Sequence, residues 1–389
     1  MKSEVFFTSA KQSYIRAEET LPLKLDAIIN KLDIPRRVKN ETVAIKMHLG
    51  GNVGYSTIHP VFVRRVVEAV LDGGGKPFVT DVSNACTDAH KRGYTRETLG
   101  CPIYPNGGLD EKYFYTKKYK YKNIEEWHLG GAMHDATFLI DLAHVKGHPT
   151  CSYGGAIKNL ALGGLIGKSR SALHDVMHFD KYWFPEKCSD KVKIKEIVES
   201  CPISALSIDK YDDSKIHIHY EECNQCEKCL EIAPKGSLLI NKINFHSFQE
   251  ACAISTYLLL STFEKSKTTF INLANQITPV CDCFGFTGAS ILPDIGIFGS
   301  DDIVALEKAT LDEIAKYKII EENVPEVMVL QKDVSHPLQM LHGKYKDPYV
   351  AVYECEKLGL GSSDYELIDI MPKEKPKFRD KIFGYISAQ

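Results

Sequence analysis

The chain has 389 residues, of which 44% are hydrophobic and 25% are charged, and its formal net charge is -3. Such a composition is typical of a globular protein. The nearly balanced charge gives no electrostatic reason to expect nucleic acid or a membrane as a partner. The sequence has no run of 18 apolar residues and no apolar signal core, so we expect a cytoplasmic protein. Twelve cysteines in a reducing compartment favour metal or redox chemistry over disulfides.

Strand and helix signals alternate through the first 170 residues. Four apolar runs rich in Val, Ile and Phe have the character of strands buried on both faces, at 3–9, 42–49, 76–83 and 136–147. Between the second and third runs, Pro60 fits the first turn of a helix and Gly73 to Gly75 fit its end. This order predicts an α/β fold, with a layered mixed sheet covered by helices.

The alternation stops near Pro185, where the sequence becomes Cys-rich and charged as far as about Asn241. Helix and strand signals resume after it, at 245–263, 268–278, 291–300 and 301–317. We therefore expect a small ferredoxin-like α+β insertion. The predicted domain limits are 1–184 and 244–389 for the two parts of the α/β body and 185–243 for the insertion.

The insertion carries most of an iron–sulfur motif. Cys223, Cys226 and Cys229 follow the spacing C-x2-C-x2-C, but Ala233 stands where the motif has its fourth cysteine before a proline. In two-cluster ferredoxins the fourth cysteine of each run ligates the other run's cluster. Cys201 also precedes a proline and can supply the missing ligand. These four cysteines predict one [4Fe-4S] cluster.

The upstream run lacks the ligands that a second cluster would need. Counted back from Cys201, its first three positions are Lys191, Ile194 and Ile197. The cysteines missing upstream and at Ala233 would all serve the same cluster, so one cluster is lost and the other keeps its four ligands. A zinc site is the alternative, although zinc favours paired C-x2-C elements, often with histidine.

A second group of chemically active residues follows the strand expected at 136–147. His148 and Cys151 form an H-x2-C pair, and a Gly-rich entry leads into a helix-like segment with Lys158 and Asn159 in its first turns. Free N–H groups at the start of a helix suit an anion, and Lys158 adds positive charge. This pattern predicts a small anionic substrate.

Two further patterns bear on a second metal ion. His174 and His178 are four residues apart, so on a helix they share a face and could bind a metal with His148 and Cys151, unless they form a plain surface pair. In an extended segment Cys281 and Cys283 would point the same way, with Asp282 opposite. The C-x-C pair could bind metal, react as a dithiol, or be buried filler.

His48 lies at the end of the strand expected at 42–49, before a Gly turn, as active-site residues often do. Lys46 is its companion candidate. A structural histidine with satisfied hydrogen bonds is the alternative at this position.

These motifs together resemble domain-of-unknown-function family 362, in its ferredoxin-containing branch. The resemblance covers about residues 40–315 and rests on K-G-H at 146–148, G-G-A-I-K-N at 154–159, C-D-C at 281–283 and P-D-I-G-I-F-G-S-D-D at 293–302. The α/β body is also similar to the two-lobed fold of lactate racemases. The family pattern implies one site of candidate catalytic residues, made of His148, Lys158, Asn159, Cys281, Asp282 and Cys283. It implies no particular substrate.

Three functions fit these features. The first is an iron–sulfur oxidoreductase, in which the cluster takes electrons from a redox partner protein and passes them to the site in the α/β body. The second is an electron carrier or binding protein without catalysis of its own. The third is a non-redox enzyme in which the cluster is structural.

Overall fold

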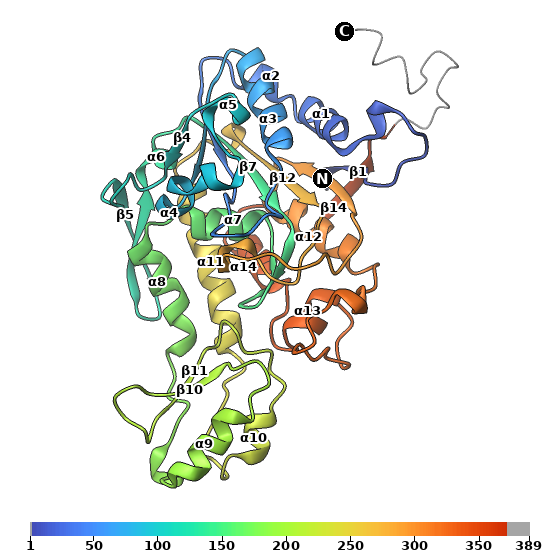
Figure 1. Cartoon of the computed structure of the whole chain (residues 1–389). Coiled ribbons are helices and arrows are strands. Elements are labelled where there is room, and N and C mark those ends of the chain that lie inside the picture. The colour runs from blue at the N-terminus through green and yellow to red at the C-terminus, as the bar shows by residue number, and fades with distance from the viewer. Residues whose placement is uncertain (1, 372–389) are drawn as a thin grey trace.

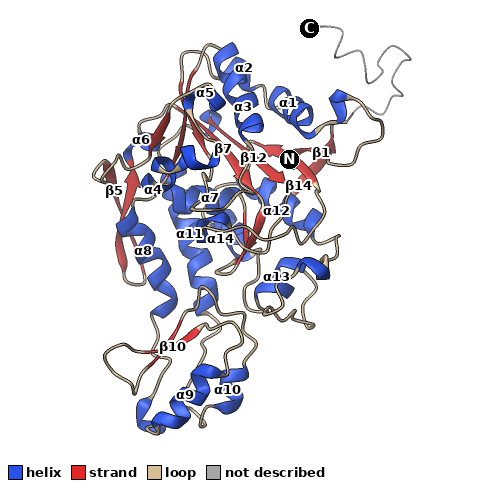
Figure 2. Ribbon diagram, in the orientation of Figure 1, coloured by secondary structure: helices blue, strands red, loops and turns tan. Residues whose placement is uncertain are grey.

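The computed structural model describes residues 2–371 and has an α/β body with a small lobe at one end (Figure 1). An eight-stranded sheet lies at the centre of the body, in the order β14-β1-β13-β12-β7-β2-β3-β4. Of these eight strands, only β13 runs antiparallel to its neighbours. Helices cover both faces (Figure 2). The predicted layered α/β fold with a mixed sheet is confirmed.

The strands of the central sheet are β1 (Ser3–Ser9), β2 (Thr42–Lys46), β3 (Lys76–Asp81), β4 (Ile103–Pro105), β7 (Phe138–His144), β12 (Thr268–Ala274), β13 (Gly296–Ser300) and β14 (Tyr365–Asp369). Three hairpins accompany the sheet: β5 (Phe114–Tyr121) with β6 (Ile124–Gly130), β8 (Lys146–His148) with β9 (Ser152–Gly154), and β10 (Leu206–Ile208) with β11 (Ile216–Ile218). Every residue of β7 and β12 is buried, because helices cover both sides of the middle of the sheet.

The longer helices of the body are α1 (Leu21–Lys31), α3 (Pro60–Asp72), α7 (Ala156–Gly163), α8 (Gly167–Asp175), α11 (Asn244–Leu260), α12 (Ile303–Ile314) and α14 (Val350–Lys357). The shorter ones are α2 (Ile34–Arg37), α4 (Ser83–Thr87), α5 (Arg96–Leu99), α6 (Gly131–His134) and α13 (Pro337–His342). Within residues 2–371, no helix combines the length and apolar character that crossing a membrane requires.

The alternating side chains of the strands divide the core into two layers. Val43 and Ile45 of β2 pack in a cluster with α1 and α3. Ala44, between them, belongs to a second cluster that contains residues of α7, α11 and α12. Successive residues of a strand face opposite sides of the sheet, so each central strand contributes to both layers.

The small lobe contains α9 (Lys191–Glu199), the β10–β11 hairpin and α10 (Lys228–Ile232). In Figure 1 it lies beyond the ends of α8 and α11, away from the central sheet. The chain enters and leaves it side by side, because Trp183 and Leu238 form an antiparallel bridge. The domain limits drawn at 185 and 243 stay a prediction.

Candidate functional site

The main cavity of the molecule lies where the parallel strands end. Its volume is about 500 Å³. Lys46 and Asp81 are the last residues of β2 and β3, and Cys281 follows β12 by a short loop. Ligands of open α/β sheets bind outside the carboxyl ends of the strands, and this cavity lies at that position. The residues used below that line it are Lys46, His48, Asp81, Lys146, His148, Gly155, Lys158, Asn159, Arg170, His174, Glu221, Cys281 and Cys283.

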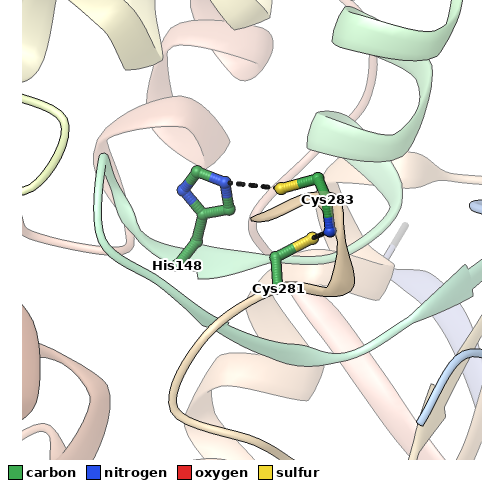
Figure 3. A group of neighbouring side chains, drawn as sticks. All are labelled: His148, Cys281 and Cys283. Atoms are coloured by element: carbon green, nitrogen blue, oxygen red, sulfur yellow. Dashed lines mark hydrogen bonds between the residues drawn. The ribbon is translucent and has the colours of Figure 1, made fainter. Parts of the chain in front are cut away.

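Cys281, Cys283 and His148 form a compact group at this cavity (Figure 3). Cys281 caps a short 3₁₀ helix (Asp282–Phe284), and its Sγ accepts the backbone N–H of Cys283 at 3.4 Å. The Sγ atom of Cys283 is 3.5 Å from Nε2 of His148. The three ligand atoms all lie within 4.8 Å of one another, and no other histidine, cysteine or carboxylate group of three in residues 2–371 is that close. Two thiols and an imidazole are ligands that suit zinc and other soft or borderline metals.

The two thiols differ in their protonation. A hydrogen bond from Cys283 lowers the pKa of Cys281 well below the usual value; burial opposes this effect, and the charges of Lys146 and His48 reinforce it. The same hydrogen bond, together with burial, raises the pKa of Cys283. Cys281 is therefore the thiolate of the pair, and Cys283 is the thiol that stabilises it.

Lys158 supplies positive charge to the cavity. Burial would lower its pKa, but the neighbouring C-x-C pair, Cys283 and Cys281, outweighs burial and raises it. Its ammonium makes no hydrogen bond and no salt bridge with any residue within 2–371. The same ammonium, with burial, lowers the pKa of His148, so that imidazole is neutral.

His48 reaches the cavity from the loop after β2, and buried charges hold it. Its Nδ1 lies 3.2 Å from Oδ2 of Asp81. That carboxylate also accepts the backbone N–H of Leu49 at 2.9 Å and pairs with Nζ of Lys46 at 3.0 Å. Burial would raise the pKa of Asp81, but Lys46 and His48 hold it low. The other ring nitrogen of His48, Nε2, is enclosed. Burial would lower the pKa of His48, but the neighbouring Cys281 and Asp81 outweigh burial and raise it.

Asn159 lies in the wall of the cavity and joins α7 to the central strands. Its Oδ1 accepts a hydrogen bond from Nζ of Lys46 at 2.7 Å, and its Nδ2 donates to Oδ1 of Asp141 at 2.5 Å. Burial raises the pKa of Asp141 well above its usual value. Asn159 therefore positions buried charged groups, and both polar atoms of its amide already have hydrogen-bond partners.

Asp282 does not line the cavity. Its carboxylate accepts hydrogen bonds at 3.1 Å from the hydroxyls of Ser56 and Thr57, and another from Thr287. It ties the loop after β2 to the C-x-C turn and so fixes the two cysteines indirectly. The family pattern implied that Asp282 belongs to the same site as the catalytic candidates. In the structure its carboxylate holds two loops together and does not face the cavity.

The set of His148, Cys151, His174 and His178 stays a prediction, and the structure groups His148 with the C-x-C cysteines. The thiol of Cys151 bonds to the carbonyl of Tyr153 at 3.1 Å, and burial raises its pKa to about 11. His174 lines the cavity beside Phe248, with a pKa lowered to about 4 by burial. His178 packs against Tyr220 and lies 3.8 Å from a carboxylate oxygen of Glu221.

Cys201, Cys223, Cys226 and Cys229 line one cavity in the small lobe. The backbone N–H of Ala205 donates to Sγ of Cys201 at 3.1 Å. No three of these sulfurs lie within 4.8 Å of one another. Zn–S bonds of about 2.3 Å in a tetrahedron would place sulfurs about 3.8 Å apart. No three of these sulfurs are therefore as close together as the ligands of one zinc ion would be.

The two cavities adjoin through Lys346 and the loop from Glu221 to Cys223. Glu221, two residues before Cys223, lines the main cavity. Nζ of the buried Lys346 donates to the carbonyls of Pro149 and Cys223, each at 2.5 Å. Those two carbonyl oxygens are therefore at most about 5 Å apart. Pro149 directly follows His148, so the loop from Glu221 to Cys223 touches the wall of the main cavity.

Sequence reasoning missed several residues of the site. Lys146 had a detectable signal, because it lies two residues before His148 in a strand and shares its face. Asp81 had a weaker one, as the last residue of a strand next to β2. Glu221, Arg170 and Lys346 had none, because their approach to the cavity depends on how the small lobe, α8 and the C-terminal segment pack.

The fold and site define an α/β protein with thiol and imidazole groups that could bind a metal ion at the carboxyl edge of its sheet. The chain belongs to the family described as Domain of unknown function (DUF362), whose model matches residues 43–312, more than half of the chain. No curated protein matches it. Among solved structures, the lactate racemase apoprotein from Thermoanaerobacterium thermosaccharolyticum is similar, with 9% identity and a TM-score of 0.31 over 70% of this chain and 51% of that one. This chain thus spans about half the length of that protein, and so weak a likeness carries no argument.

Proposed function

We propose that the protein is an iron–sulfur oxidoreductase of the ferredoxin-containing branch of its family. One [4Fe-4S] cluster, held by Cys201, Cys223, Cys226 and Cys229, would supply single electrons to the main cavity. The contact between the loop from Glu221 to Cys223 and the cavity wall, through Glu221 and Lys346, is the observation that carries the proposal. A cluster that delivered electrons only to an external partner would not need this contact.

The residues of the small lobe fit a cluster. The four cysteines line one cavity, no three of their sulfurs are as close together as the ligands of one zinc ion, and Sγ of Cys201 accepts a backbone N–H. Hydrogen bonds to ligand sulfurs are among the features that set the potential of such clusters. Cys188 is buried and is not among the residues that line this cavity, so we give it no ligand role.

The main cavity would receive the electrons and the substrate. The thiols of Cys281 and Cys283, with an imidazole from the same cavity, would hold a second metal ion. Lys158 would bind a small anionic substrate, because its ammonium has no salt bridge within residues 2–371 and projects from the first turn of α7. A redox partner protein would reduce the cluster, and a reducing cytoplasm would keep the free cysteines as thiols.

The experiment compares Co²⁺ with Zn²⁺ in the main cavity of anaerobically purified protein reduced with dithionite. The power saturation of the reduced-cluster signal is recorded by electron paramagnetic resonance. Co²⁺ is paramagnetic and Zn²⁺ is not, so a cluster beside the cavity should relax faster with Co²⁺. The Cys281→Ala/Cys283→Ala double variant should keep the cluster and lose the effect. Equal relaxation with both metals bound would contradict electron delivery to this cavity and favour a carrier.

A further inference from the structure

Two histidines border the thiol pair, and their hydrogen bonds differ. Nδ1 of His148 lies 3.2 Å from the backbone nitrogen of Thr150. A backbone N–H can only donate, so Nδ1 accepts and the neutral ring carries its proton on Nε2. That Nε2 is the atom 3.5 Å from Sγ of Cys283. His148 is therefore arranged to donate a hydrogen bond to sulfur, because no lone pair of its Nε2 is left for a metal.

His48 has the opposite arrangement. Its Nδ1 is 3.2 Å from Oδ2 of Asp81, and an ionised carboxylate can only accept. Nδ1 therefore keeps its proton, and Nε2 is the nitrogen that a metal ion would bind. Nε2 is enclosed, and the neighbouring thiol is that of Cys281. Metal-ligating histidines almost always donate their other ring N–H to a carboxylate, a carbonyl or water.

The residues that hold His48 in place are buried and bonded to one another. Asp81 is 2% exposed and Lys46 is 1% exposed, and they form an ion pair at 3.0 Å. Asn159 accepts a second hydrogen bond from Lys46. A buried ion pair costs desolvation free energy that its own attraction often does not repay. Its effect here is to hold the His48 imidazole beside Cys281.

His48 also lies beside the thiol pair, because its charge and that of Cys281 interact. Its Nε2 is outside the group of atoms that lie within 4.8 Å of one another, so metal binding must bring it inward. The loop after β2, which carries His48, and the C-x-C turn would have to approach each other, and hydrogen bonds already join them. The backbone N–H of Val53 donates to the carbonyl of Gly285 at 3.0 Å, and Asp282 accepts from Ser56 at 3.1 Å.

We propose that Cys281, Cys283 and His48 bind a first-row transition metal ion, that Asp81 is a positioning residue for His48, and that His148 donates a hydrogen bond to the Cys283 sulfur. This inference rests on the second metal ion of the proposed function and identifies its imidazole ligand. The distances between ligand atoms alone would select His148 as the imidazole ligand, whereas the hydrogen bonds of the two rings select His48.

The test measures Co²⁺ and Zn²⁺ affinity of the full-length, anaerobically purified protein by competition with a chromophoric chelator. His48→Gln and His148→Gln are the matched pair, since both remove one imidazole from the same cavity. We expect His48→Gln to weaken binding at least as much as Asp81→Asn, for which about 10- to 100-fold is typical of a supporting residue. His148→Gln keeps an amide N–H donor for the Cys283 sulfur, so its loss of affinity should be smaller than that of His48→Gln.

X-ray absorption at the zinc edge checks the ligands directly, in the unmutated protein and in His148→Gln. The proposal predicts two sulfur ligands and one imidazole, and the imidazole contribution should persist in His148→Gln. Loss of binding in His148→Gln with binding kept in His48→Gln and Asp81→Asn would overturn it, as would a protein that binds neither metal. Iron and sulfide are counted on the same samples. Their absence with Co²⁺ binding intact would overturn the cluster and leave this inference standing.

Discussion

At the residue scale, the site depends on charged groups that the fold buries together. Lys46 pairs with Asp81 at 3.0 Å and donates to Asn159, which in turn donates to Asp141. Each group compensates the desolvation of the next. Removing one member therefore leaves a buried charge without a partner.

Lys46→Met should lower the free energy of unfolding by about 3–5 kcal/mol, the cost of breaking a buried pair by removing one partner. Thermal unfolding measures the loss, and Lys39→Met, which removes an exposed lysine, is the control. If the two variants unfold at the same temperature, the network contributes no stability and the account of Asp81 fails.

Buried neutral histidines give the protein a second residue-scale property. Burial lowers the pKa of His336 to about 4 and that of His342 to about 3. In the unfolded chain a histidine titrates near 6.5. Between these values the unfolded state binds more protons, so stability falls as the pH drops from about 6.5 toward 4.

Each such histidine should remove up to about 1.4 kcal/mol of unfolding free energy per pH unit in that window. Urea unfolding of the parent and of His336→Gln at pH 7, 6 and 5 isolates the contribution of one group. The variant should show the flatter pH dependence. Parallel curves would mean that His336 is not buried as a neutral ring.

At the element scale, part of the site could be read from the sequence and part could not. Strand ends and Gly-rich turns at His48, His148 and Lys158 carry a local signal, because strands place ligands at their carboxyl ends. The sequence around Cys281 does not predict the backbone conformation of the C-x-C turn. The sequence suggested an extended segment, and the structure has a 3₁₀ turn there that Cys281 caps. The role of Asp282 in holding two loops together depends on contacts with distant residues, which periodicity does not encode.

The close packing of β8 against the loop before Cys281 predicts a sensitive glycine. A Cβ at Gly147 would lie 2.4 Å from the carbonyl oxygen of Pro279, so Gly147→Ala must displace that backbone. We expect about 1–3 kcal/mol of destabilisation and weaker Zn²⁺ binding. Gly288→Ala is the control, because its Cβ would meet only the Pro279 side chain at 3.4 Å. Equal effects of the two variants would contradict the packing argument.

At the scale of the whole molecule, the small lobe is joined to the body through Lys346. This lysine is fully buried, donates to the carbonyls of Pro149, Tyr220 and Cys223, and accepts a hydrogen bond at its own carbonyl from Ser152. The spacing of the four lobe cysteines was readable from the sequence. The packing of the lobe against the body could not be read from the sequence, because it depends on a residue more than 100 positions away from Cys223.

Lys346→Met should loosen this packing and lower the reduction potential of the cluster, because it removes a buried positive charge beside Cys223. Hydrogen exchange of residues 219–224 measures the first effect, and a redox titration followed by electron paramagnetic resonance measures the second. Lys344→Met removes a partly exposed lysine near Glu227, so its effect should be smaller because solvent screens its charge. A potential unchanged in Lys346→Met would contradict a cluster at Cys223.

The central claim is that the small lobe holds one [4Fe-4S] cluster, and metal analysis tests it most directly. Iron, acid-labile sulfide and zinc are measured in protein purified without oxygen, alongside the spectrum after dithionite. The account predicts about four irons and four sulfides per chain in the parent and in Cys188→Ala, and neither in Cys226→Ala. Zinc without sulfide would contradict it and make the lobe a structural zinc site.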